Sequence, residues 1–163
     1  MKFEPTLSRR FSRYICDFLL DDGIDPEPIL KECGLTTSVK QEYDAPLSIS
    51  TVARLFELSG QRTQNPHIGL KLAQRYHYES AGLIILTVLA APTAEMGIKA
   101  LCHYVKYTDS AIETEFKIGP HESVFSISLI SPLYKGIRHL AEFLLAFWIN
   151  ILYKGTRVFN VMT

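Results

Sequence analysis

At 163 residues, the chain has the length of one ordinary domain, so we expect residues 1–163 to fold around a single core. With 47% apolar and 21% charged residues, the composition excludes intrinsic disorder and fibrous low complexity. Lys and Arg together number 17, as do Asp and Glu, and this balance excludes an electrostatic clamp for nucleic acid. The chain by itself is therefore not expected to bind DNA.

The cysteines and the apolar segments predict a soluble, cytoplasmic protein. Cys16, Cys33 and Cys102 are too widely spaced for a CxxC pair and odd in number, which indicates reduced thiols. The first ten residues mix charged side chains with a proline, unlike a secretory signal. The most apolar run, Phe143 to Ile149, is far shorter than the about 20 residues that cross a bilayer. We expect no membrane partner.

Apolar residues recur at helical spacing through the first two thirds of the chain. This pattern predicts helices over residues 7–22, 25–33, 48–64, 67–75, 83–91 and 93–107. Gly23 and Gly34 are the predicted stops of the first two helices. Ser48 or Ser50 is predicted to cap the third helix, and Thr93 the last one.

The hydrophobic period changes after Asp109. Alternating apolar and polar residues predict an antiparallel hairpin over about 111–131 with its turn at 119–122. Residues 137–153 then predict a helix that is apolar almost all round, and residues 157–162 predict a further strand. No partner follows that strand, so we interpret the domain as truncated at its C-terminal end. The predicted fold class is α+β, mostly helical, with helices packed on a small antiparallel sheet.

The sequence carries no strong catalytic motif. It contains no glycine-rich phosphate loop, no GxSxG elbow and no HExxH. His139 and Glu142 share one helical face, but two ligands on one helix do not make a metal site. We therefore predict a protein that is not an enzyme, with no catalytic residue, no metal and no cofactor. A small metal-dependent enzyme that uses His139 and Glu142 is the alternative.

Polar aromatic side chains gather between two predicted helices and at the end of the second one. Rings with hydroxyl groups beside an imidazole and a guanidinium are suited to line a small-molecule pocket. The alternative is a solvated loop whose tyrosines pack their rings and expose their oxygens. The candidate ligand-binding residues are Arg75, Tyr76, His77, Tyr78, Tyr104 and Tyr107.

The apolar run at 143–149 has two interpretations. It belongs either to the core or to the interface of a homodimer, since such interfaces resemble a core cut in half. We predict a homodimer on this basis.

Several short patterns follow one another in a characteristic order. The first is a G-hydrophobic-D-P helix start at Gly23 to Pro26, and the second is an Asn-Pro pair that opens a helix at Asn65 to Leu72. A pair of predicted helices at Gly82 to Ala100 follows, and then the tetrapeptide L-A-E-F at Leu140 to Phe143. Taken in order over residues 15–155, the chain resembles the N-terminal effector domain of AraC-type transcriptional regulators. It is most similar to the branch described as arabinose-binding, which includes ornithine-utilisation-type regulators.

The resemblance implies a domain that senses a small-molecule effector, dimerises, or does both, and so regulates a C-terminal DNA-binding module. The sequence shows no helix-turn-helix region, so contact with DNA is expected only through a C-terminal domain absent from this chain. The name of the family branch does not identify arabinose as the effector. A structural dimerisation module without a ligand is the alternative function.

Overall fold

The computed structural model of the chain describes residues 4–35, 45–76, 83–130 and 137–161. Within these ranges, seven helices and two antiparallel two-stranded sheets follow one another. The strands are β1 (Thr6–Leu7), β2 (Leu47–Ser48), β3 (Ile112–Ile118) and β4 (Ser123–Leu129). The helices are α1 (Arg10–Asp21), α2 (Glu27–Glu32), α3 (Ile49–Arg62), α4 (Ile68–Arg75), α5 (Leu83–Leu89), α6 (Ala94–Thr108) and α7 (Ile137–Val161). The predicted fold class, α+β and mostly helical, is confirmed.

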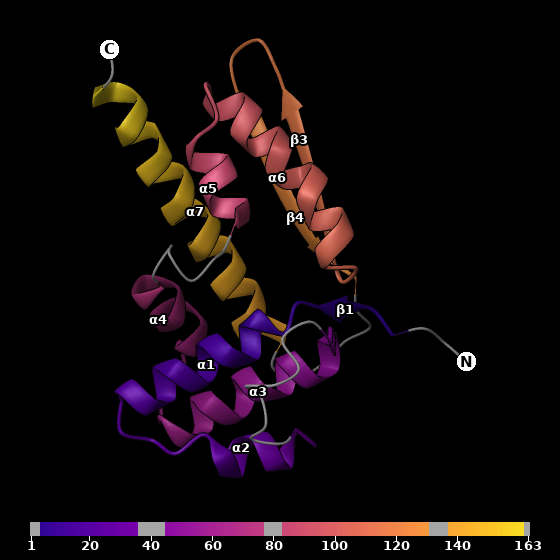
Figure 1. The fold of residues 1–163 in the computed structure, drawn as a ribbon, viewed down its shortest axis with the longest axis vertical. Coiled ribbons are helices and arrows are strands. Elements are labelled where there is room, and N and C mark those ends of the chain that lie inside the picture. Colours follow the sequence, from indigo (N-terminus) through magenta and orange to yellow (C-terminus); the bar gives the residue numbers. More distant parts are fainter. Residues whose placement is uncertain (1–3, 36–44, 77–82, 131–136, 162–163) are drawn as a thin grey trace.

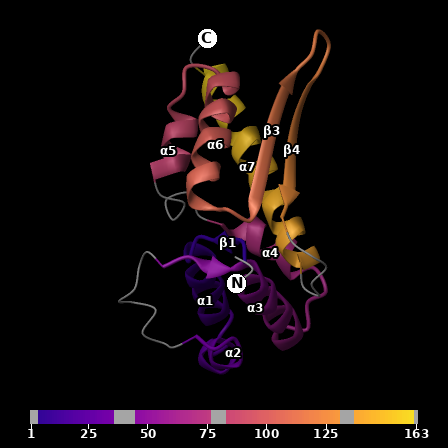
Figure 2. The ribbon, with the colours of Figure 1, turned by 90° about the vertical axis from the view of Figure 1, so that its right-hand side faces the viewer.

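The described elements form two lobes joined by one long helix (Figures 1 and 2). The N-terminal lobe, residues 4–76, contains α1 to α4 and the β1–β2 pair. The hairpin lobe, residues 83–130, contains α5, α6 and the β3–β4 hairpin. Helix α7 runs along both lobes and packs against α3, α4, α5 and α6.

The N-terminal lobe is built around apolar side chains that are fully buried. They come from one face each of α1, α3 and α4 and include Ile15, Leu19, Val52, Leu55, Phe56, Ile68 and Leu72. Ser59 is also fully buried on the inner face of α3, beside these apolar residues.

Local signals mark one helix end and two helix starts at the positions that the sequence predicts. Gly23 adopts a φ of 72°, the left-handed conformation that glycine tolerates best, directly after α1. The Ser48 hydroxyl accepts a hydrogen bond of 3.2 Å from the Thr51 amide at the start of α3. The Thr93 hydroxyl accepts one of the same length from the Met96 amide at the start of α6. Three predicted boundaries are therefore confirmed.

Helix α7 lies unusually close to α4. A Cβ atom on Gly69 would lie 2.0 Å from the carbonyl oxygen of His139, so only glycine permits this approach. Two side chains from other helices satisfy carbonyl groups at the end of α4: the Tyr14 hydroxyl donates to the Leu72 oxygen, and the Asn150 amide donates to the Ala73 oxygen at 3.4 Å. These contacts hold α1, α4 and α7 together.

The predicted hairpin is confirmed. Strands β3 and β4 pair in antiparallel register from Ile112 opposite Leu129 to Ile118 opposite Ser123. Ile112 and Thr114 are buried, whereas the side chains of β4 are exposed or half-buried. The hairpin therefore contributes one partly covered face to the core.

The predicted strand at 157–162 is wrong as far as residue 161, because α7 continues through Gly155 to Val161. A strand needs hydrogen-bond partners on a neighbouring strand, whereas a helix satisfies its backbone groups internally. Continuation of the helix costs only the unfavourable propensity of one glycine, about 1 kcal/mol. Among the helices within the described ranges, none is both long and apolar enough to cross a membrane.

The chain segment around β1 connects the two lobes. The Ser8 amide donates to Asp109 Oδ1 at 2.7 Å, and the Thr6 amide donates to the Ser110 hydroxyl at 2.9 Å. The Ala111 amide donates to the Thr6 carbonyl oxygen at 3.0 Å. The start of the chain is thereby fixed to the junction between α6 and β3.

Candidate functional site

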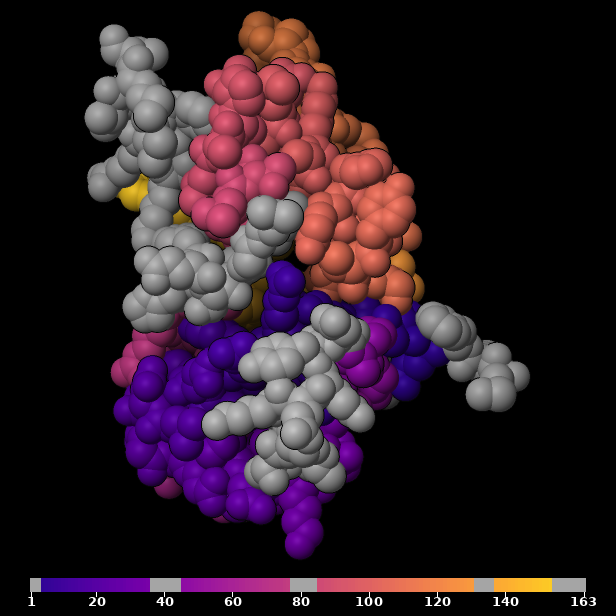
Figure 3. Space-filling model, viewed as in Figure 1, coloured from indigo at the N-terminus to yellow at the C-terminus, as the bar shows by residue number. Residues whose placement is uncertain are grey.

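A cavity of about 460 Å³ lies where the two lobes and α7 meet. The N-terminal lobe contributes Ser8, Arg9, Arg10, Phe11, Tyr14, Pro46 and Tyr76. The hairpin lobe contributes Ile85, Tyr104, Val105, Tyr107, Thr108, Asp109 and Ile112, and α7 contributes Phe143, Leu144, Phe147 and Trp148. Figure 3 shows a hollow between the indigo atoms of the N-terminal lobe and the salmon atoms of the hairpin lobe.

Aromatic rings form a continuous cluster along one side of the cavity. The rings of Phe143 and Phe147 stack at 5.7 Å, and Phe147 contacts Trp148 edge-on at 4.8 Å. Tyr76 packs edge-on against Phe147 at 4.7 Å and Phe11 against Phe143 at 5.9 Å. Because these contacts fix the rings on one another, this wall is rigid and apolar.

Polar groups gather on the other side of the cavity. Asp109 uses both carboxylate oxygens: Oδ1 accepts from the Ser8 amide, and Oδ2 accepts from the Thr108 hydroxyl at 2.7 Å. Burial raises the pKa of Asp109, and the hydrogen bonds from Thr108 and Ser8, with a smaller contribution from the charge of Arg10, oppose part of that rise. Burial likewise raises the pKa of Tyr76 to about 12, again with Arg10 opposing it.

One buried donor in the cavity wall has no partner. The side chain of Trp148 is only 7% exposed, and its indole Nε1 makes no hydrogen bond. A buried N–H group without an acceptor costs about 1–3 kcal/mol, so such groups are uncommon in folded proteins.

The structure brings together three of the six predicted site residues. Tyr76, Tyr104 and Tyr107 line the cavity, with Tyr107 at its mouth because its side chain is 77% exposed. Arg75 does not line it. His77 and Tyr78 lie outside the described residues.

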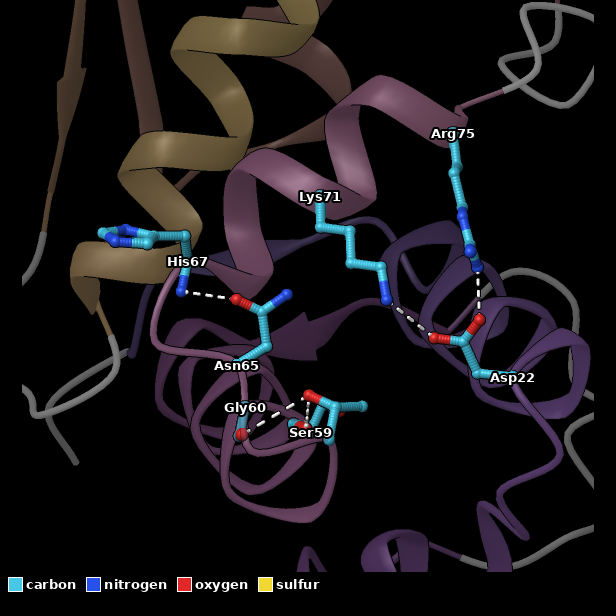
Figure 4. Close-up of polar contacts among 8 residues, drawn as sticks. Asp22, Ser59, Gly60, Asn65, His67, Lys71 and Arg75 are labelled. Carbon is cyan, nitrogen blue, oxygen red and sulfur yellow. Dashed lines mark hydrogen bonds and ion pairs between the residues drawn. The ribbon is translucent and has the colours of Figure 1, made fainter.

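Arg75 belongs to a separate polar cluster on the N-terminal lobe (Figure 4). Its guanidinium pairs with Asp22 at 2.5 Å, and Lys71 pairs with the other carboxylate oxygen at 3.0 Å. These two hydrogen bonds hold the pKa of Asp22 below its usual range. Arg75 also lies over the Phe18 ring, with 5.0 Å between the guanidinium carbon and the ring centre. In this arrangement Arg75 stabilises the α1–α4 contact.

Comparison with known families identifies the domain type. The family model for the N-terminal arabinose-binding domain of AraC transcription regulators matches residues 23–158. The chain belongs to this family. A search of curated proteins finds no match to it.

The AraC-type match covers α2 to α6, the hairpin and most of α7, whereas α1 and β1 precede it. The cavity of this AraC-type domain therefore combines walls from inside the matched region with one wall from α1. Sequence reasoning missed Arg10, Phe11 and Tyr14 as site residues and assigned Phe143, Phe147 and Trp148 to a core or an interface. The sequence did contain a signal for these residues: Phe11 and Tyr14, and likewise Phe143 and Phe147, are aromatic residues spaced three or four apart, so each pair shares one helical face.

The pair His139 and Glu142 gives the AraC-type domain no metal site within the described residues. His139 Nδ1 lies 3.6 Å from Glu142 Oε2, and Arg138 pairs with the other carboxylate oxygen at 2.7 Å. Among the residues that the structure describes, no group of three potential metal ligands occurs. The geometry offers no support for the metal-dependent alternative.

Proposed function

We propose that this AraC-type domain binds a small-molecule effector in the cavity between its lobes. The main support for this proposal is the cavity itself. Its volume is about 460 Å³, and it is lined mostly by aromatic and aliphatic side chains with a few convergent polar groups. Small-molecule sites typically have volumes of about 300–1,000 Å³ and this kind of lining. Family membership supports a regulatory role for the binding event.

In the proposed mechanism, the effector stabilises one arrangement of the two lobes. A ligand shifts a conformational equilibrium only if it binds one state better than another. The cavity draws its walls from both lobes and from α7, so a ligand that contacts all three favours the arrangement in which they lie close together. Helix α7 then transmits the change to a DNA-binding module of the regulator, through which alone the protein contacts DNA.

We assign the binding role first to Tyr76 and Tyr104, which line the cavity from opposite lobes, and then to Tyr107 at its mouth. His77 and Tyr78 directly follow Tyr76 in the sequence and stay candidate ligand-binding residues. We retain no binding role for Arg75, because it pairs with Asp22 away from the lining. The site as proposed uses no cofactor, and the regulator acts in the cytoplasm.

A thermal-shift screen tests this function. Any compound that binds only the folded state raises the melting temperature by mass action. We expect at least one compound from a set of amino acids, sugars, polyamines and carboxylic acids to do so. Tyr104→Ala should reduce that shift, whereas Leu20→Ala on the exposed side of α1, outside the lining, should not. A screen without any shift, or a shift that both variants retain in full, contradicts the proposal.

We also propose that two copies associate through α7. Leu145, Ile149 and Tyr153 are 54%, 64% and 57% exposed, and their spacing of four residues puts them on one helical face. Light scattering coupled to size exclusion should report a dimer that Ile149→Asp converts to a monomer. A monomer at all concentrations of the unsubstituted chain contradicts this assignment. A dimer that binds no compound in the screen would instead favour the alternative, a structural dimerisation module.

A further inference from the structure

We propose that the effector is an uncharged aromatic compound whose ring packs among the aromatic side chains of the cavity. This inference rests on the proposed function, since it names the class of ligand for the same cavity. Three properties of the lining support it: its aromatic content, the partners of its charged groups, and the hydroxyl groups that it presents.

The lining is rich in aromatic rings. Eight of its eighteen described residues are aromatic, whereas aromatic residues make up 11% of the whole chain. Rings attract one another through their faces and edges beyond the apolar area that they bury. A ligand ring therefore gains contacts here that an aliphatic body of the same size does not gain. Helix α1 supplies Phe11 and Tyr14, α6 supplies Tyr104 and Tyr107, and α7 supplies Phe143 and Phe147.

Several of these rings have surface left for a ligand. The side chains of Phe11, Tyr14, Tyr76 and Tyr104 line the cavity and are only half-buried. Tyr14 and Tyr76 contact each other edge-on at 4.5 Å, and Phe11 packs edge-on against the buried Phe143. Because these contacts hold the rings at fixed angles, little ordering is needed when a further ring binds beside them.

The charged groups of the described lining already have partners. Both carboxylate oxygens of Asp109 accept hydrogen bonds, one from the Ser8 amide and one from the Thr108 hydroxyl. Arg9 and Arg10 each have an interaction within the protein. A charged ligand would lose hydration in a mostly apolar site without an open counter-charge, which is unfavourable. The lining therefore favours an uncharged ligand.

The hydroxyl groups of the lining are also suited to a neutral ligand. Six of them, from serine, threonine and tyrosine, line the cavity. Those of Tyr14 and Thr108 already donate, to the Leu72 carbonyl oxygen and to Asp109. Burial raises the pKa of Tyr76 to about 12, so its phenol stays protonated at neutral pH. Since a hydroxyl both donates and accepts, this set fits one neutral polar substituent, such as a hydroxyl or carbonyl group.

The same properties rank the compounds of the thermal-shift screen. Aromatic amino acids and aromatic carboxylic acids carry the ring and should bind. They should bind more weakly than uncharged aromatic compounds, because their charged groups lose hydration. Sugars and polyamines have no ring to place against the aromatic side chains and should not bind.

Four probes test the inference with the full chain. They are 4-phenyl-1-butanol, its saturated counterpart 4-cyclohexyl-1-butanol, its charged counterpart 4-phenylbutyrate, and L-arabinose. Trp148 is the one tryptophan of the sequence and lines the cavity, so its fluorescence reports binding, and thermal shifts provide a second measurement. We expect the phenyl alcohol to bind about threefold or more tightly than the cyclohexyl alcohol, and about tenfold or more tightly than the acid. Arabinose should change neither signal.

Substitutions show whether the lining rings cause the preference for the phenyl alcohol over the cyclohexyl alcohol. Phe11→Leu and Tyr104→Leu each remove a half-buried ring and keep an apolar side chain, and each should reduce this preference. Phe18→Leu, on the same helix as Phe11 but outside the lining, is the matched control and should leave the preference unchanged. Tyr104→Phe keeps the ring without its hydroxyl and should also retain the preference.

The possible outcomes distinguish a wrong ligand class from a wrong function. Binding of the cyclohexyl alcohol or of the acid as tightly as the phenyl alcohol overturns the assignment of an uncharged aromatic ligand. A preference that both leucine variants of the lining retain, or that Phe18→Leu loses equally, also overturns it. Binding of arabinose or of a polyamine without binding of the phenyl alcohol overturns it while leaving the sensing function intact. If the four probes and the whole compound screen give no shift, the sensing function itself fails.

Discussion

The two lobes of the molecule differ in how completely they bury their apolar side chains. In the N-terminal lobe, residues such as Ile15, Leu55 and Phe56 are fully enclosed by neighbouring helices. In the hairpin lobe, Ile118 and Val124 are exposed and one whole strand is at best half-buried. Regions with fewer buried apolar contacts open at lower free energy than a well-packed core. The N-terminal lobe is therefore the scaffold, and the hairpin lobe is the adaptable wall of the cavity.

The largest expected effect tests the scaffold at its closest contact. Gly69→Ala places a methyl group against the backbone of α7, which cannot rotate away, and should cost about 3 kcal/mol of folding free energy. Gly97→Ala is the matched change in the hairpin lobe, where the new Cβ would lie 2.9 Å from the Val88 oxygen of the short helix α5. Both glycines lie in helices, so the gain in helix propensity, about 1 kcal/mol, offsets a larger share of the smaller strain at Gly97. Urea denaturation of both variants measures the difference, and equal losses would contradict the comparison.

The connection between the lobes should give the next largest effect. Asp109→Ala leaves the Ser8 amide without its acceptor and should cost about 2 kcal/mol. Asp109→Asn should cost less, since the amide oxygen can still accept from Ser8. Hydrogen exchange should accelerate at Ser8 and Ala111 in the alanine variant while amides of α3 stay protected. Uniform acceleration across both lobes would show that they unfold as one unit.

Two helix caps of similar chemistry, Ser48 in the N-terminal lobe and Thr93 in the hairpin lobe, allow the stability of the two lobes to be compared. Ser48→Ala and Thr93→Ala each remove a hydroxyl that accepts from a first-turn amide at 3.2 Å, and each should cost about 1 kcal/mol. The loss from Ser48→Ala should appear in global unfolding, because α3 belongs to the scaffold. The loss from Thr93→Ala should appear mainly as faster exchange in α6. Ser48→Asn and Thr93→Asp should restore stability, and failure to do so would exclude capping as the cause.

The smallest effect concerns the response of each region to pH. Asp22→Asn should cost less than about 1 kcal/mol at pH 7, because its partners Lys71 and Arg75 are partly exposed. The pKa of Asp22 is lowered in the folded state, so its contribution is present above the unfolded pKa and lost as the pH falls.

The pKa of Asp109 is raised by burial, so its contribution has the opposite sign: it is full below the unfolded pKa and lost as the pH rises through the folded pKa. Between pH 7 and pH 3, Asp22→Asn should therefore lose less stability than the unsubstituted chain and Asp109→Asn more. Melting temperatures across that range measure both slopes. The change in melting temperature of each variant is compared with that of the unsubstituted chain. Two differences of the same sign would contradict the assignment of the two carboxylates.

Much of the fold follows from local patterns in the sequence. Gly23, Ser48 and Thr93 act within a few residues of the helix ends that they determine, so their roles can be read without a structure. The β3–β4 hairpin is equally local, since its partners are joined by a short turn. The error at residues 157–161 arises because a short run of β-branched and aromatic residues suits a strand only when a neighbouring strand is available.

The candidate site was predictable only in part for a related reason. The sequence draws attention to Tyr76, Tyr104 and Tyr107 by their side-chain chemistry, and all three reach the cavity. It gives no indication that Arg75 turns to Asp22, or that Phe11 meets Phe143 across the molecule. The sequence by itself determined which segments are helices, where most of them begin and end, and which faces are apolar, because those properties depend on neighbours within a few residues. Only the tertiary structure decided which apolar faces enclose a core and which enclose a cavity, because that depends on how distant helices pack.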